Sequence, residues 1–241
     1  MTEIRQLAGR AALVTGGTRG IGFEIATRLR DDGAVVTVTG TGQDSTGPDG
    51  TAYRAVDFTM DDAVDAFAAS LRDNAPDILV NNAGLNRNAP FADIDLDDFD
   101  TLHQINLRTP VALMQAVLPG MRKNQWGRVI NIGSIWSKLA RPGRASYAAS
   151  KFGLDGVTAA AAAEVAADGV LVNMVSPGII DTELTRRTVD RERLKSLLAD
   201  VPAGRLGQPQ EIAAFVTWLA GPENTFISGQ NIAIDGGFTR V

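Results

Sequence analysis

The chain alternates short runs rich in β-branched residues with longer stretches in which apolar residues recur at helical spacing. The short runs are apolar at nearly every position, which is typical of strands buried on both faces of a parallel sheet. Parallel strands need crossover connections, and the helical stretches lie between them. The pattern therefore predicts an α/β fold with a doubly wound, seven-stranded parallel sheet and helices on both faces. The predicted strands are Ala11–Thr15, Ala34–Thr39, Ala52–Val56, Asp77–Asn81, Arg128–Ile132, Val170–Val175 and Asn231–Asp235, and the predicted helices are Gly20–Arg30, Met60–Arg72, Leu96–Arg122, Ala149–Ala167 and Gln210–Leu219.

A single domain, residues 1–241, is expected to include the whole chain. No proline-rich or serine-rich linker divides it, and no internal repeat is present. The segment Thr39–Gly50 is rich in glycine and polar residues, which are unfavourable for a full helix. The crossover between the second and third predicted strands is therefore expected to be shortened.

Composition excludes several classes of protein and of site. The 241 residues are 44% apolar and 21% charged, which is ordinary for a soluble globular protein. The absence of cysteine excludes disulfides and thiolate metal sites, and no metal site is predicted. A net charge of −5 without a basic cluster argues against a nucleic-acid partner. No apolar run approaches the thickness of a bilayer and the N-terminus has no hydrophobic signal region, so we expect no membrane partner and a cytoplasmic location.

The first predicted strand continues directly into the sequence T-G-G-T-R-G-I-G, from Thr15 to Gly22, which opens the first predicted helix. Glycines at positions 16, 20 and 22 let the backbone approach a pyrophosphate, whose charge is favoured by a helix N-terminus. Their spacing differs from the common G-x-G-x-x-G pattern, so the generic dinucleotide motif is the wrong template. A glycine-rich turn without a ligand is the alternative. The position of the motif at the first strand, turn and helix favours a dinucleotide cofactor.

A candidate catalytic centre follows the fifth predicted strand. Ser134 lies at the end of that strand, and Tyr147 and Lys151 lie four residues apart in the first turns of the next helix. This spacing places the tyrosine and the lysine on one helical face, where a neighbouring ammonium lowers the pKa of the phenol. Such a tyrosine can exchange a proton with a carbonyl or alcohol oxygen, to which Ser134 could also hydrogen-bond. The alternative is a packed tyrosine beside a solvated lysine, which the same spacing would produce.

Taken together, these motifs make the chain similar to the classical short-chain dehydrogenase/reductase family over essentially its whole length. The resemblance also rests on N-N-A-G at Asn81–Gly84, Asn106, Pro177–Gly178, Thr182 and D-G-G at Asp235–Gly237. It implies a single-domain Rossmann fold and an oxidoreductase activity that depends on a nicotinamide cofactor.

The resemblance implies a role for each of four catalytic residues. Tyr147 would be the acid/base, and Ser134 would donate a hydrogen bond to the substrate. Lys151 would tune the pKa of the tyrosine and bind the ribose of the cofactor. Asn106 would hold a water molecule that connects Lys151 with bulk solvent; an ordinary polar residue of a helix is the alternative.

The choice between NADP(H) and NAD(H) depends on the residues that follow the second predicted strand. An acid there would bind the adenosine ribose diol and repel a 2′-phosphate, but the segment Thr39–Thr41 contains none. Arg19 could pair with the 2′-phosphate and Thr41 could donate to it, so NADP(H) is preferred. Asp57 is expected to contact the adenine or, alternatively, to cap a helix. The predicted cofactor-binding residues are Gly16, Thr18, Arg19, Gly20, Ile21, Gly22, Thr41, Asp57, Asn82, Ala83, Gly84, Tyr147, Lys151, Pro177, Gly178, Ile180 and Thr182.

Within the family, the chain is most similar in pattern to the 3-oxoacyl-(acyl-carrier-protein) reductases. Those enzymes carry two arginines that dock the acidic carrier protein near the active-site entrance. The corresponding residues here are Gln125 and Asp168, which argues against carrier docking, although Arg122 and Lys123 could compensate.

Two further features concern the substrate. Trp136 and Arg144 lie between Ser134 and Tyr147 in the sequence and are predicted to line the substrate pocket; for the arginine, a position facing solvent or another subunit is the alternative. Residues 179–200 resemble the helical lid that closes over the substrate in this family and excludes water.

The sequence therefore predicts an NADP(H)-dependent oxidoreductase that transfers a hydride between nicotinamide and a small ketone or secondary alcohol. The alternative enzyme is a 3-oxoacyl-(acyl-carrier-protein or CoA) reductase. A non-catalytic nucleotide sensor on the same fold is a third hypothesis, disfavoured because the catalytic set is intact. Family members commonly form tetramers, so a homotetramer that pairs the helices at 96–122 and 149–167 is expected.

Overall fold

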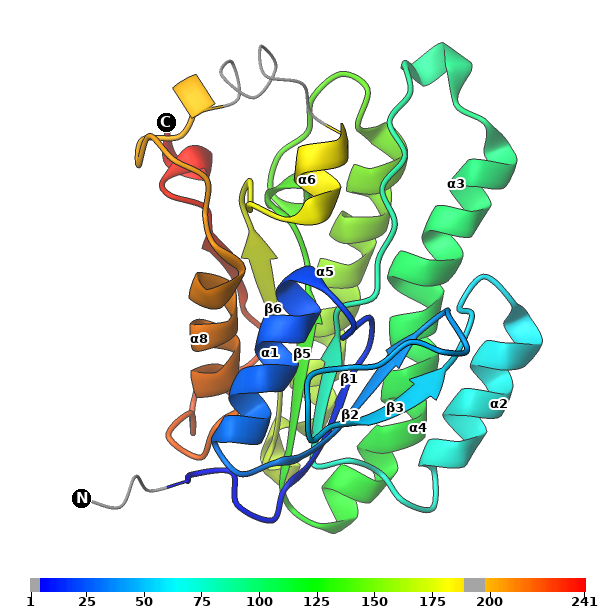
Figure 1. Cartoon of the computed structure of the whole chain (residues 1–241), viewed down its shortest axis with the longest axis vertical. Helices are drawn as coiled ribbons and strands as arrows, with labels where there is room; N and C mark the ends of the chain where they lie inside the picture. The colour runs from blue at the N-terminus through cyan, green and yellow to red at the C-terminus, as the bar shows by residue number, and fades with distance from the viewer. Residues whose placement is uncertain (1–4, 189–197) are drawn as a thin grey trace.

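The computed structural model describes residues 5–188 and 198–241, which form one α/β domain. The predicted parallel sheet is confirmed, with the strand order β3-β2-β1-β4-β5-β6-β7 (Figure 1). Every strand pair is parallel, as expected for strands joined by crossovers. The strands are β1 (Ala11–Val14), β2 (Val35–Gly40), β3 (Ala52–Ala55), β4 (Ile78–Asn81), β5 (Gly127–Ile132), β6 (Val170–Pro177) and β7 (Asn231–Ile234).

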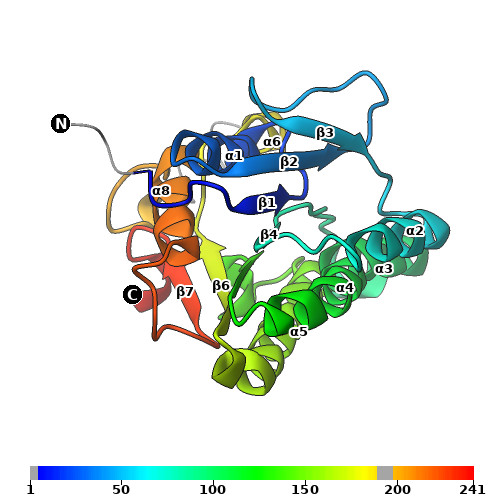
Figure 2. The same cartoon turned by 90° about the horizontal axis from the view of Figure 1, so that it is seen from below.

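Helices cover both faces of the sheet (Figure 2). On one face lie α1 (Gly20–Asp31) and α8 (Pro209–Ala220), and on the other lie α2 (Asp61–Leu71), α3 (Leu96–His103), α4 (Thr109–Lys123) and α5 (Ala145–Val165). Short helical turns are η1 (Phe91–Asp93), η2 (Gln104–Arg108), η3 (Ile135–Ser137), η4 (Ala166–Asp168) and η5 (Phe238–Arg240), and α6 (Glu183–Thr188) follows β6. None of the helices among the described residues is long and apolar enough to cross a membrane.

The sheet separates two apolar cores because its central strands bury side chains on both faces. On one side, Val14 of β1 belongs to the same buried cluster as Leu29 of α1 and Val216 of α8. On the other, Leu79 of β4 belongs to a cluster with Val117 of α4. All five side chains are fully buried, and burying each contributes about 1.5–3 kcal/mol.

The predicted continuous helix over 96–122 is wrong, because the π-helical turn η2 separates α3 from α4. Pro110 supplies the physical reason. A proline has no N–H for the carbonyl four residues earlier, here that of Asn106, and its ring crowds that carbonyl. A π turn absorbs the interruption without breaking the helix axis, and such turns are frequent at functional sites.

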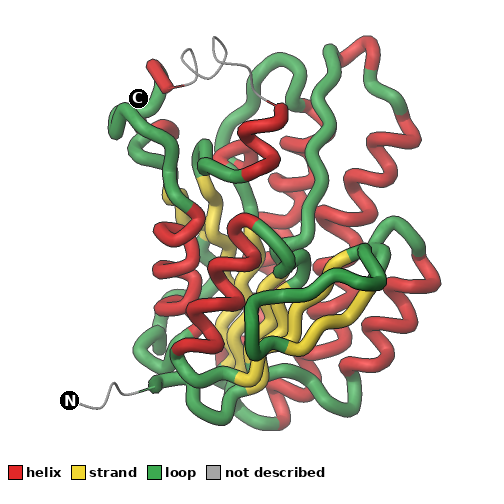
Figure 3. The backbone as a smooth tube through the Cα atoms, in the orientation of Figure 1, coloured by secondary structure: helices red, strands yellow, loops and turns green. Residues whose placement is uncertain are grey.

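Two other boundaries matter for the site. Helix α5 begins at Ala145, four residues before its predicted start, so Tyr147 in its first turn and Lys151 in its second both lie in regular helix. The connection from β2 to β3, which was predicted to be a shortened crossover, contains no helix (Figure 3).

The predicted lid at 179–200 is described only in part. Its first residues include a β-bridge between Ile180 and Gly207, followed by α6. Residues 189–197 lie outside the described residues.

The candidate site lies at the carboxyl ends of the strands. Strand β1 pairs with both β2 and β4, so the chain runs outward in opposite directions from this point. In open parallel sheets, ligands bind in the crevice outside the carboxyl ends of strands at such a switch point. The segments after β1, β4, β5 and β6 all start at that edge.

Candidate active site

The end of β5 and the start of α5 bring Ser134, Tyr147 and Lys151 together. Ser134 caps η3, where its hydroxyl accepts a hydrogen bond from the backbone N–H of Trp136 at 3.3 Å. Lys151 is 4% exposed, and its ammonium donates to the carbonyl of Ile132 at 2.9 Å. The same ammonium lies 5.7 Å from the centre of the Tyr147 ring. The predicted serine, tyrosine and lysine are therefore neighbours in space.

Burial has the largest effect on the pKa values of Tyr147 and Lys151. Desolvation lowers the pKa of Lys151 to about 8. Burial also raises the pKa of Tyr147, more than a hydrogen bond with Ser134 and the positive charge of Arg144 lower it. The expectation that the lysine leaves this tyrosine with a lowered pKa is therefore wrong for this structure. The physical reason is that desolvation of the partly buried phenol outweighs its hydrogen bond with Ser134 and the charge of Arg144.

Asn106 is fully buried inside the π turn η2, and its side chain links the segment after β4 to α5. Its side chain accepts from the backbone N–H of Leu85 at 2.9 Å and donates to the Leu85 carbonyl at 2.8 Å. It also donates to the hydroxyl of Ser150 on α5 at 3.1 Å. A Cβ placed on Gly84 would lie 3.3 Å from the Asn106 amide oxygen and 3.8 Å from the Lys151 nitrogen. Asn106 thus holds the segment after β4 against the residues that surround Lys151.

The phosphate loop after β1 is tied to the segment after β4. The amide of Asn82 donates to the carbonyls of Thr15 at 2.9 Å and Gly16 at 3.0 Å. The buried hydroxyl of Thr15 accepts from the backbone N–H groups of Asn82 and Ala83, each at 2.9 Å. This role of Thr15 was not predicted from the sequence; its position at the strand end, before the first glycine, is the only local signal.

Glycines are required in this loop by close backbone contacts. Gly16 and Gly20 have φ angles of 64° and 57°, which favour glycine. A Cβ on Gly16 would lie 3.0 Å from the Cα of Ala83, and one on Gly22 would collide with the Gly16 carbonyl. The start of α1 has no side-chain cap and no acidic residue in its first turn. This helix N-terminus therefore has the backbone N–H groups and the dipole that favour a pyrophosphate.

The segment after β6 faces the phosphate loop. A Cβ on Gly20 would lie 3.7 Å from the methyl group of Thr182. Pro177 ends β6, and the N–H of Gly178 donates to the Ile234 carbonyl at 2.9 Å. Ile180 is 6% exposed. The structure therefore places Thr182 against the loop, whereas Ile180 packs inward.

The residues predicted to bind the adenosine end lie after β1, β2 and β3. Arg19 and Thr41 are exposed, and Thr18 lies against the end of β2. Asp57 does not cap α2, because Met60 is the residue before that helix. Its carboxylate accepts from the N–H and the hydroxyl of Thr59 at 3.0 and 2.7 Å.

The two predicted substrate-pocket residues lie beside the catalytic group but in different surroundings. Trp136 is 7% exposed and packs edge-on against Phe238, with ring centres 6.1 Å apart. It therefore belongs to the core and does not form an open wall of the pocket. The Arg144 guanidinium lies 5.2 Å from the Trp136 ring and donates to Asn88 at 2.7 Å. Sequence reasoning missed Asn88 and Phe238, because both come from segments distant in the sequence.

The site holds no cluster of metal ligands within the described residues. His103, the lone histidine, contacts the Phe99 ring in a tilted arrangement with ring centres 4.0 Å apart and hydrogen-bonds to the Phe99 carbonyl. The groups that this site offers for chemistry are the hydroxyl, phenol, ammonium and amide described above.

Comparison with known proteins identifies the family. The family model described as enoyl-(acyl carrier protein) reductase matches residues 16–239. The 3-oxoacyl-(acyl-carrier-protein) reductase FabG of Vibrio cholerae is 40% identical, over 98% of this chain and 99% of that protein. A solved short chain dehydrogenase/reductase family protein has a TM-score of 0.90 at 36% identity, covering 98% of this chain and 100% of its own. A gluconate 5-dehydrogenase from Burkholderia cenocepacia J2315, solved with NADP and tartrate, has a TM-score of 0.90 at 32% identity, covering 99% and 98%. The chain therefore belongs to the short-chain dehydrogenase/reductase family of NAD(P)-dependent oxidoreductases.

Proposed function

We propose that the protein interconverts a small ketone and its secondary alcohol with NADP(H), and that Tyr147 is the acid/base. The observation that carries the proposal is the grouping of Ser134, Tyr147 and Lys151 at the carboxyl edge of the sheet, the edge to which the phosphate loop also belongs. When bound, the nicotinamide supplies or accepts the hydride.

The chain fits such a cofactor at three places. Gly16, Gly20 and Gly22 would leave room for the pyrophosphate at the start of α1. The segments Asn82–Gly84 and Pro177–Thr182, together with Lys151, would hold the nicotinamide riboside. Arg19 and Thr41 would hold the 2′-phosphate, and Gly40, the last residue of β2, stands where an acid would repel that phosphate. The gluconate 5-dehydrogenase solved with NADP supports this choice.

The pKa values favour one direction of proton movement. A tyrosine with a raised pKa is protonated at neutral pH, so Tyr147 can donate its proton to a carbonyl oxygen that accepts a hydride. Ser134 would orient that oxygen by a second hydrogen bond. Lys151, with a pKa of about 8, is mostly protonated at neutral pH and would stabilise the phenolate left after the transfer.

A 3-oxoacyl thioester is the second candidate substrate, because FabG of Vibrio cholerae is 40% identical to the chain. Carrier docking has weaker support. Gln125 and Asp168 lie just before β5 and β6, at the amino edge of the sheet and opposite Ser134, so they do not border the active-site entrance of the same chain as expected. The carboxylate of Asp168 binds the guanidinium of Arg122 at 2.6 Å, so this arginine is neutralised rather than presented to an acidic partner. A thioester of coenzyme A would need no such docking surface.

A substrate panel separates these candidates. NADPH and NADH oxidation would be measured with free small ketones, cyclic ketones, keto acids, acetoacetyl-CoA and a carrier-linked 3-oxoacyl group. Turnover of free ketones with NADPH, lost in Tyr147→Phe, is the expected result. Faster turnover of the thioesters would replace the proposal with the 3-oxoacyl reductase, and NADPH binding without turnover of any carbonyl would favour a nucleotide sensor.

We also propose a homotetramer that pairs α4 and α5 between copies. The outward face of α5 carries Phe152, which is 45% exposed, together with exposed alanines at 159, 160 and 163. Small residues let two helices approach closely, and an exposed phenylalanine on such a face is suited to burial. Light scattering at working concentration tests this, and a monomeric mass would refute it.

A further inference from the structure

The helix-free connection between β2 and β3 folds back over the sheet instead of leaving it (Figure 3). Pro48 in this loop is buried, and a Cβ on Gly47 would collide with the side chain of Val38 in β2. The loop therefore covers the outer part of the face that a crossover helix would cover. It must also fix, without helical hydrogen bonds, the residues that follow β2.

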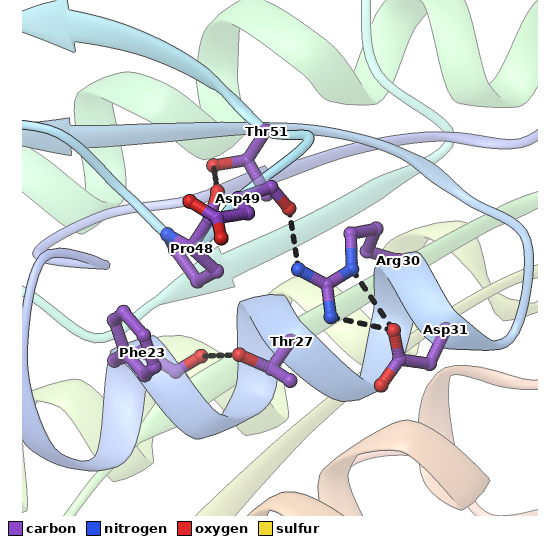
Figure 4. A network of polar contacts seen from close by, with 7 residues as sticks. All are labelled: Phe23, Thr27, Arg30, Asp31, Pro48, Asp49 and Thr51. Carbon is purple, nitrogen blue, oxygen red and sulfur yellow. Dashed lines mark hydrogen bonds and ion pairs between the residues drawn. The ribbon is translucent and has the colours of Figure 1, made fainter.

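The second half of the loop is anchored on α1 (Figure 4). The Arg30 guanidinium donates to the carbonyl of Asp49 and binds the carboxylate of Asp31. The hydroxyl of Thr51 donates to the Pro48 carbonyl at 2.6 Å. These contacts all lie at the end of the loop that enters β3.

The first half is anchored by Tyr53 of β3. Its phenol donates to the carbonyl of Gly42 at 2.5 Å. The same side chain packs over the end of β2, since a Cβ on Gly40 would lie 3.1 Å from the Tyr53 oxygen and 2.8 Å from the methyl group of Thr18. Tyr53 thus joins the end of β2 to the turn at Gly42, Thr41 lies between its two contact points, and Thr18 of the phosphate loop packs against the same end of β2.

We infer that Tyr53 is a positioning residue for the adenosine end of the cofactor. By holding the Gly42 carbonyl, it fixes Thr41 next to the phosphate loop in the orientation that receives the 2′-phosphate. The close packing around Gly40 also leaves no room for the acid that would bind the ribose diol of NAD(H). This inference rests on the proposed use of NADP(H). It identifies Tyr53 as the residue that orients Thr41 toward the 2′-phosphate in a connection where no helix follows β2.

The test measures binding to the adenosine end without catalysis. Isothermal titration of 2′,5′-ADP and 5′-AMP compares ligands that differ by the 2′-phosphate alone. Removing one hydroxyl in Tyr53→Phe is expected to weaken 2′,5′-ADP binding about three- to ten-fold, in line with the loss of one hydrogen bond. Binding of 5′-AMP is expected to change less than about two-fold, because that ligand does not depend on Thr41.

Thr51→Val is the matched control. It removes a hydroxyl that donates to a carbonyl of the same loop at similar length, but at the end distant from Thr41. The preference for 2′,5′-ADP is expected to survive in this variant. Melting temperatures of both variants report whether the fold is retained.

Four results would overturn the inference. If the unmodified protein clearly prefers 2′,5′-ADP over 5′-AMP and Tyr53→Phe keeps that preference, the inference about Tyr53 is overturned. The proposed NADP(H) preference is then unaffected. An equal loss of both ligands in Tyr53→Phe, or the same loss of preference in Thr51→Val, means that the hydroxyl supports only the fold of the loop. An unmodified protein that binds both ligands equally overturns the proposed NADP(H) preference, and the inference with it.

Discussion

Replacing Lys151 by methionine is expected to stabilise the protein at pH 7 while it removes activity. The side chain is 4% exposed, and burial lowers its pKa from the ordinary 10.5 to about 8. Since one pKa unit corresponds to about 1.4 kcal/mol, keeping the ammonium charged in the folded protein costs about 3 kcal/mol. Methionine has a similar length and no charge, so it escapes this cost. It also loses the hydrogen bond to the Ile132 carbonyl, which offsets about 1–2 kcal/mol of the gain.

The sign of the pH dependence follows from the depressed pKa. Between pH 8 and 10.5 the unfolded chain binds more protons at this position than the folded chain, so the free energy of unfolding rises with pH. The cost of the charged lysine is therefore fully present below pH 8 and falls to about 1 kcal/mol near pH 9.5. Lys151→Met should be about 1–2 kcal/mol more stable at pH 7, and no more stable than the unmodified protein at pH 9.5.

Urea denaturation followed by tryptophan fluorescence at both pH values measures this difference. Lys138→Met is the matched control, because the Lys138 ammonium also donates to a backbone carbonyl, that of Asn231 at 2.7 Å, but is exposed. The control should show no gain at pH 7. Two results would refute the claim that desolvation of the Lys151 ammonium destabilises the folded protein. Lys151→Met could be less stable than the unmodified protein at pH 7, or its gain in the free energy of unfolding could be the same at both pH values.

Three further substitutions probe the site. Tyr147→Phe should lower kcat by about 10²–10⁴-fold in steady-state assays, with little change in the dissociation constant for NADPH, because only the proton donor is removed; retained turnover would exclude the proposed acid/base. Asn106→Ala should lower the free energy of unfolding, measured in urea, by about 2–4 kcal/mol, because it leaves the N–H and carbonyl of Leu85 without their partner. A loss below about 0.5 kcal/mol would instead show that water replaces the amide. Gly22→Ala should lower the melting temperature and the affinity for NADPH together, since its Cβ collides with a carbonyl of the phosphate loop; unchanged values of both would contradict the close packing.

Much of the fold could be predicted because its signals are local. The apolar runs in β1 and β4 needed only their own composition, and the glycine-rich Thr39–Gly50 segment indicated a crossover without a full helix. The helix over 96–122 was predicted as continuous because its apolar spacing continues through the interruption. The local signal for that interruption is Pro110, and its effect depends on where the helix lies relative to the carbonyl four residues earlier.

The candidate site divides in the same way. Spacing alone placed Tyr147 and Lys151 on one helical face, and the strand end placed Ser134 nearby. The direction of the Tyr147 pKa could not be predicted, since it depends on how much protein surrounds the phenol. The buried environment of Trp136 depends on Phe238, which lies about one hundred residues later in the chain.

The sequence by itself determined the order of strands and helices, the position of the phosphate loop and the chemical groups of the candidate centre. These follow from side-chain periodicity, glycine positions and spacings of a few residues, which act within one element. Only the tertiary structure decided that Asn106 clamps Leu85, that Thr15 ties two loops together and that Tyr53 holds the turn after β2. Those contacts join residues 11 to 68 positions apart, and burial by distant segments sets both their strength and the pKa values of the groups between them.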